Sequence, residues 1–171
     1  MGFSFVPDYY FETFEYADAS LLSSLGIKGI ILDVDNTLEP YEHPLPGEHV
    51  MAWLNSLNDV GISAAIVSNN NSERIDLFNG ELGLFAISRA RKPFKRSLIR
   101  AMEAMGTKKE NTAIIGDQIF TDVLAGKWAG LAVTILVVPI NDKRDVFTRF
   151  KRLLERPIIK KYRKRKAKEN K

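Results

Sequence analysis

Apolar residues along the chain form short continuous runs separated by longer stretches with helical spacing. The runs are rich in Ile and Val and do not alternate with polar residues, which is typical of parallel strands covered on both faces. The predicted strands are residues 29–32, 63–67, 85–87, 112–115 and 132–138. The predicted helices are residues 17–25, 48–60, 72–82, 94–105 and 120–128. This alternation predicts a doubly wound, Rossmann-like α/β domain with a parallel sheet.

Length and composition narrow the class of protein. A chain of 171 residues fits roughly one domain. The absence of cysteine excludes disulfides and thiolate metal sites. The longest apolar run, residues 131–140, is too short for a spanning helix, which needs ~20 residues, and residues 1–5 do not have the features of a signal peptide. We therefore expect a cytoplasmic protein whose contact with a membrane, if any, is peripheral and on the inner face.

Charge divides the chain into two parts. Residues 143–171 carry 14 Lys and Arg against 3 Asp and Glu, whereas residues 1–142 carry 11 against 18. The net charges are therefore +11 and −7, which sum to the overall +4. Apolar residues recur at helical spacing in the basic part, and Pro157 is expected to break that helix. We predict a domain over residues 1–142, followed by a basic amphipathic C-terminal helix and tail over residues 143–171.

The basic segment predicts contact with an anionic surface. Apolar side chains lie between the basic ones over residues 146–168, as they do in helices that bind anionic membranes. Binding of RNA or a ribosome through phosphate charge is a weaker alternative. A solvated tail without a partner is a third.

Four polar motifs lie where predicted elements meet. In a parallel sheet, ligands bind beyond the carboxyl ends of the strands, so these motifs are expected to converge. Converging carboxylates repel one another unless a cation such as Mg²⁺, which prefers oxygen ligands, lies between them. A hydroxyl near a helix N-terminus and a lysine both suit a phosphate. The motifs are Asp33-Val34-Asp35-Asn36-Thr37, Ser68-Asn69-Asn70, Lys92-Pro93 and Gly116-Asp117-Gln118-Ile119-Phe120-Thr121-Asp122.

In this order, the motifs resemble those of the haloacid dehalogenase superfamily of aspartyl phosphotransferases. The resemblance implies a phosphatase in which Asp33 is the nucleophile and Asp35 the general acid and base. The implied Mg²⁺ ligands are Asp33, Asp35 through its backbone carbonyl, Asp117 and Asp122. The implied phosphate ligands are Ser68, Asn69 and Lys92. Asn69 also suits a turn, Asp122 equally suits orienting a metal-bound water, and Asn36 stands where many members have glycine.

Members of the superfamily usually gain specificity from an inserted cap domain. Residues 38–63 and 68–92 have room for only one helix each besides loops and a short strand, so the core is expected to be capless and open. The chain also resembles the YqeG-type branch, which is related to phosphatidylglycerophosphate phosphatases, in Val6-Pro7-Asp8 and in the run from Leu25 into the first motif. This resemblance implies a phosphorylated small molecule or a phospholipid headgroup as substrate, with phosphatidylglycerophosphate first. A soluble or protein-bound phosphate is the alternative.

Overall fold

Six parallel strands form one sheet in the order β1-β6-β5-β2-β3-β4. The structure is a computed structural model, and it describes residues 5–141 and 146–169. The strands are β1 (Tyr9–Phe11), β2 (Gly29–Leu32), β3 (Ser63–Val67), β4 (Phe85–Ile87), β5 (Thr112–Gly116) and β6 (Val133–Val137). The doubly wound parallel sheet is confirmed, and β1 is a strand that the sequence analysis did not predict.

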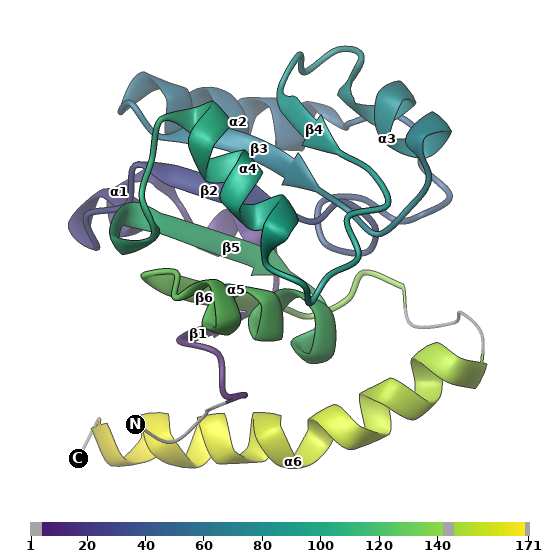
Figure 1. Cartoon of the computed structure of the whole chain (residues 1–171). Coiled ribbons are helices and arrows are strands. Elements are labelled where there is room, and N and C mark those ends of the chain that lie inside the picture. The colour runs from purple at the N-terminus through teal and green to yellow at the C-terminus, as the bar shows by residue number, and fades with distance from the viewer. Residues whose placement is uncertain (1–4, 142–145, 170–171) are drawn as a thin grey trace.

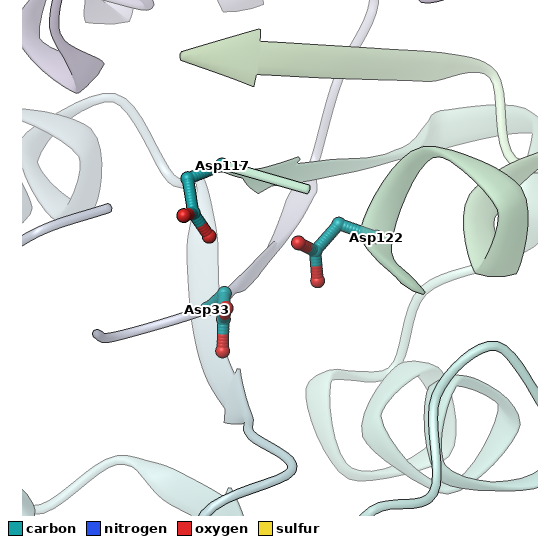
Figure 2. Close-up of side chains that lie close together, drawn as sticks. All are labelled: Asp33, Asp117 and Asp122. Carbon is teal, nitrogen blue, oxygen red and sulfur yellow. The ribbon is translucent and has the colours of Figure 1, made fainter. Parts of the chain in front are cut away.

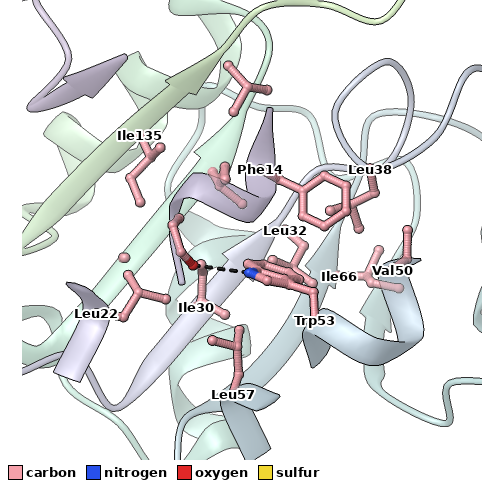
Figure 3. Packing of buried hydrophobic residues seen from close by; sticks show 14 of the residues in the cluster. Phe14, Leu22, Ile30, Leu32, Leu38, Val50, Trp53, Leu57, Ile66 and Ile135 are labelled. Atoms are coloured by element: carbon pink, nitrogen blue, oxygen red, sulfur yellow. Dashed lines mark hydrogen bonds between the residues drawn. The ribbon is translucent and has the colours of Figure 1, made fainter. Parts of the chain in front are cut away.

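Helices cover both faces of the sheet (Figure 1). They are α1 (Ala19–Ser24), α2 (Glu48–Asp59), α3 (Ser72–Asn79), α4 (Arg96–Met105) and α5 (Leu124–Ala129), with short turns at Phe14–Tyr16, Lys109–Asn111 and the π-helical Ile119–Val123 (η3). Ile30 of β2 packs in one core cluster with Trp53 of α2, part of which Figure 3 shows. Ile31 packs in a second cluster with Leu98 of α4. Because successive strand residues point to opposite faces, a strand buried on both sides is apolar throughout.

The loops at the carboxyl ends of the strands are short. Residues 33–47, between β2 and α2, contain only an isolated bridge between Asp35 and Glu39, and α3 is the single helix between β3 and β4. Neither segment holds an inserted domain, so the carboxyl edge of the sheet is open, as expected. Asn36 has a φ of +62°, a backbone conformation that asparagine tolerates better than most residues.

The last helix, α6 (Val146–Glu169), lies beside β1 and the edge of the sheet (Figure 1). Ile158 and Ile159 pack against a small cluster made by Ile119, Val123 and Leu136. Tyr162 is buried, and its hydroxyl accepts a hydrogen bond of 3.1 Å from the backbone N–H of Tyr10. The helix therefore packs on the domain that precedes it.

α6 runs through Pro157, so the predicted break is wrong. Proline removes one backbone hydrogen bond from a helix, but packing of the next residues on the domain holds the helix together. The predicted domain boundary between residues 142 and 143 lies outside the described residues. None of the described helices is both long enough and apolar enough to cross a membrane.

Candidate active site

The predicted site residues converge at the carboxyl edge of the sheet. A cavity of about 500 Å³ opens there. Its lining includes six of the predicted residues, which are Asp33, Asp35, Ser68, Asn69, Lys92 and Asp117. The seventh, Asp122, is completely buried and contacts Lys92. Asn70, which belongs to the predicted Ser68 motif but was given no role, also lines the cavity, and so does Tyr41, which no motif included.

Three buried carboxylates point toward one another (Figure 2). One oxygen from each of Asp33, Asp117 and Asp122 lies within 4.8 Å of the other two. Gly116 makes this approach possible, because a Cβ at that position would collide with the Asp122 carboxyl group. A donor set made only of carboxylate oxygens fits a hard cation such as Mg²⁺. The Asp35 side chain does not belong to this group of described carboxylates.

Lys92 lies between two of these carboxylates. Its Nζ is 3.0 Å from Asp33 Oδ1 and 2.6 Å from Asp122 Oδ1. Burial alone would lower the pKa of the Lys92 ammonium, but the charges of Asp122 and Asp33 raise that pKa above its ordinary value. Burial raises the pKa of Asp33 from 3.8 to about 6, with Lys92 opposing the rise and Asp122 adding to it. The cation thus stays charged, and the Asp33 carboxylate is in an environment that penalises its ionised form.

Asn69 fixes the backbone beside this lysine. Its Oδ1 accepts a hydrogen bond of 2.7 Å from the N–H of Lys92, and its Nδ2 donates one of 3.2 Å to the Lys92 carbonyl. Asn69 therefore positions Lys92, and a phosphate contact by Asn69 itself stays a prediction.

The Ser68 hydroxyl accepts a hydrogen bond of 3.2 Å from the N–H of Asn70 and can still donate its own proton. Asn71 caps α3 by accepting from the N–H of Arg74.

Two further residues near the site, Arg74 and Glu155, were missed in the sequence. Arg74 and Asn70 bond the two carboxylate oxygens of Asp35. Glu155 of α6 is buried, and its Oε1 accepts a hydrogen bond of 2.7 Å from the N–H of Ile119, between Asp117 and Asp122. The signal for Arg74 is its place in the first turn of the helix that follows the Ser68 motif. Glu155 could have been singled out because it is the only acidic residue between residues 146 and 168, which are otherwise rich in Lys and Arg.

Comparisons with known proteins identify the family. A family model described as haloacid dehalogenase-like hydrolase matches residues 40–130. A Bacillus subtilis (strain 168) protein named "Probable phosphatase YqeG" is 40% identical over 155 residues, which cover 91% of this chain and 90% of that protein. The chain belongs to the haloacid dehalogenase superfamily. It is a phosphatase of this superfamily, of the YqeG type, as its motifs predicted.

Solved structures agree on the fold. The cobalt-bound deoxy-D-mannose-octulosonate 8-phosphate phosphatase of Haemophilus influenzae has a TM-score of 0.55 at 19% identity, over 74% of this chain and 75% of that one. A hypothetical protein from Xanthomonas campestris has a TM-score of 0.53 at 18% identity, over 80% of this chain and 74% of that one. At these identities the likeness concerns the fold alone. The roles of individual site residues stay predictions.

Proposed function

We propose that the protein is a Mg²⁺-dependent phosphomonoesterase that works through an aspartyl-phosphate on Asp33. The observation that carries the proposal is the group of three buried carboxylates beside Lys92. Among the ion pairs of the described residues, the carboxylates of the site pair with the cations Lys92 and Arg74, and with four aspartates at the site, counting Asp35, negative charge is in excess and would repel a phosphate dianion. Mg²⁺ supplies the positive charge that offsets this excess. Its proposed ligands are Asp33, Asp117, Asp122 and the backbone carbonyl of Asp35.

The side chains can then divide the reaction into two steps. A carboxylate oxygen of Asp33 attacks phosphorus, and Asp35 donates a proton to the oxygen that leaves. Asp35 next accepts a proton from the water that attacks the aspartyl-phosphate, which releases inorganic phosphate and regenerates Asp33. The Lys92 Nζ is 3.0 Å from Asp33 Oδ1, and Ser68 lines the same cavity, which supports the proposal that the ammonium and the Ser68 hydroxyl stabilise the phosphoryl oxygens during both steps.

We further propose that the phosphate lies on a membrane lipid, and that the substrate is phosphatidylglycerophosphate. The described part of α6 exposes many basic side chains, which are Arg156, Lys160, Lys161, Arg163, Lys164, Arg165 and Lys168. The same helix contacts the loop of Asp117 and Asp122 through Glu155. Of these side chains, Arg156 lies near Asp117, whereas Arg165 contacts Pro7, before β1. An anionic bilayer that binds them, at about 1 kcal/mol each near the surface, would therefore lie along the β1 edge of the sheet, with one end beside the loop of Asp117. This arrangement supports a substrate presented by a membrane.

A soluble phosphate ester is the second candidate. The observation that favours it is the lining of the cavity, which is polar apart from the ring of Tyr41 and provides no apolar groove for acyl chains. Either substrate class would place only its phosphate and headgroup at Asp33. The two candidates differ in whether presentation on a bilayer raises the rate.

The decisive experiment is phosphate release from phosphatidylglycerophosphate in mixed micelles and from p-nitrophenyl phosphate, each with Mg²⁺ and with EDTA. We expect release from both esters with Mg²⁺ only, and none from Asp33→Asn. Asp59→Asn, an exposed aspartate on α2, is the matched control and should keep full activity. Turnover of p-nitrophenyl phosphate without turnover of the lipid would discard the lipid substrate and keep the chemistry.

The contribution of α6 is tested by reversing charge at Lys160, Lys161 and Lys164. On vesicles that contain anionic lipid, the ratio of lipid turnover to p-nitrophenyl phosphate turnover should be lower for the charge-reversed variant than for wild type. The wild-type ratio should fall similarly when salt is added, because salt screens the same charges. A ratio unchanged by charge reversal would refute membrane presentation. Salt-sensitive binding to RNA with no effect of anionic vesicles would favour the RNA alternative.

A further inference from the structure

Arg74 is a buried arginine that contacts three residues around the site. Only 9% of the residue is exposed. Its Nε donates a hydrogen bond of 3.1 Å to Asp35 Oδ1, and its Nη1 donates one of 2.8 Å to the carbonyl of Pro44. The guanidinium also lies 5.2 Å from the centre of the Phe78 ring, on the next turn of α3. These contacts join α3 to two places in the loop of residues 33–47, which are Asp35 in its first motif and Pro44 near its end.

The second oxygen of Asp35 is held as well. Asn70 Nδ2 donates a hydrogen bond of 2.7 Å to Asp35 Oδ2. A carboxylate offers about four lone-pair positions, two on each oxygen. Arg74 and Asn70 use one position on each oxygen, which fixes the plane of the carboxylate and leaves one position per oxygen for a proton. Because Asn70 and Arg74 both come from the segment after β3, this segment sets the direction in which Asp35 presents its proton.

We propose that Arg74 is a positioning residue for proton transfer by Asp35. The proposal rests on the proposed function, in which Asp35 protonates the leaving oxygen. Two nitrogens of one planar guanidinium reach two acceptors at once, the Asp35 carboxylate and the Pro44 carbonyl. A lysine has a single nitrogen on a flexible chain and cannot reproduce both contacts with fixed geometry. Arg74 thereby couples the orientation of Asp35 to the loop that places Tyr41 in the cavity.

Substrates whose leaving groups differ in basicity distinguish a role of Arg74 in proton transfer by Asp35 from a role in folding. A p-nitrophenolate ion leaves without being protonated, whereas the alkoxide of glycerol 3-phosphate requires a proton from Asp35. Arg74→Met removes the guanidinium and keeps an unbranched, apolar side chain against Phe78. With Mg²⁺ present, kcat/KM of Arg74→Met for glycerol 3-phosphate should fall ~100-fold, the lower part of the usual range for general acid catalysis. For p-nitrophenyl phosphate it should fall only a few-fold, with phenyl phosphate between the two.

Four further variants complete the test. Asp35→Asn should show the same dependence on leaving group, and adding Arg74→Met to it should cost little more, because the two residues act as one unit. Arg74→Lys should fall between wild type and Arg74→Met. Arg100→Met, an exposed arginine on α4, should leave all three rates unchanged.

The outcomes separate the two proposals. Equal losses on all three esters would mean that Arg74 only supports the fold, and a rise in KM for glycerol 3-phosphate at unchanged kcat would mean that it binds substrate. Either result overturns the positioning role and leaves the phosphatase intact. Wild-type protein that hydrolyses none of the three esters would instead overturn the proposed function.

Discussion

The replacement Asp33→Asn should make the metal-free protein more stable near neutral pH. Burial raises the pKa of Asp33 from 3.8 to about 6 in the folded state. An acid whose pKa is higher in the folded state ionises first in the unfolded chain, so wild-type stability falls as pH rises from about 4 to about 6 and then levels off. At 1.36 kcal/mol per pKa unit, the difference between 3.8 and 6 corresponds to about 3 kcal/mol. Asparagine does not ionise, so the variant escapes this cost while its amide oxygen can still accept from Lys92.

The assay is urea unfolding in EDTA, for wild type and variant, near pH 4 and near pH 7. Near pH 7 the free energy of unfolding of the variant should exceed that of wild type by as much as about 3 kcal/mol, which corresponds to roughly 6–12 °C in Tm for a chain of this size. Near pH 4 the two free energies should differ little. Adding Mg²⁺ should stabilise wild type by mass action and the variant much less, because one of three carboxylates is lost. Asp59→Asn on α2 is the control and should follow wild type.

Unfolding free energies that run parallel for wild type and Asp33→Asn from pH 4 to pH 7 would refute this reasoning. Such a result would mean that solvent reaches Asp33, or that Lys92 already compensates its charge. A variant that is less stable than wild type in EDTA at pH 7 would be a stronger refutation, because the ion pair with Lys92 would then outweigh burial.

Two further substitutions test contacts away from the nucleophile. Trp53→Phe removes the indole N–H that donates to the carbonyl of Ala17 at 3.1 Å (Figure 3) and leaves that buried carbonyl unpaired, so urea unfolding should show a loss of about 1–3 kcal/mol. Glu155→Ala removes the acceptor of the Ile119 N–H. The Mg²⁺ concentration that gives half-maximal turnover of p-nitrophenyl phosphate should then rise by ~10-fold. Glu155→Gln keeps an oxygen acceptor and should shift this concentration much less. An unchanged Mg²⁺ requirement in Glu155→Ala would show that α6 does not support the loop of Asp117 and Asp122.

The central strands were readable from sequence because their position demands a continuous apolar run. β2 and β5 are covered on both faces, so every side chain in them is apolar or small, apart from a buried threonine at the start of β5. β1 was missed because it is an edge strand of three partly buried aromatic residues, which show no strand periodicity. Tyr and Phe favour strands, but a strand of three residues that pairs with β6 at the edge of the sheet is too short to be recognised from that preference.

The site also contains residues that could be predicted from the sequence and residues that could not. The acids after β2 and β5 could be predicted, because parallel strands carry their loop residues to one edge and because spacing in the motif places Asp33 and Asp35 together. The partner of Asp35 could not, because Arg74 reaches it across a separation of 39 residues. Such a pairing depends on how far the guanidinium extends from α3 over the loop of residues 33–47, and this is a property of the assembled fold.

α6 shows why a basic amphipathic segment is ambiguous in sequence. Its apolar residues Ile158, Ile159 and Tyr162 fit a helix that lies on a membrane, but they pack against the protein's own domain. Among the described side chains of α6, Leu153 and Leu154 are the large apolar ones that stay about half exposed. An anionic surface bound at the described side chains of α6, as proposed, would therefore meet mainly charge there, so the binding should weaken steeply with salt. Glu155 of the same helix accepts a hydrogen bond from the loop of Asp117 and Asp122, so the proposed binding surface would begin beside the proposed metal site and run from there toward the residues before β1.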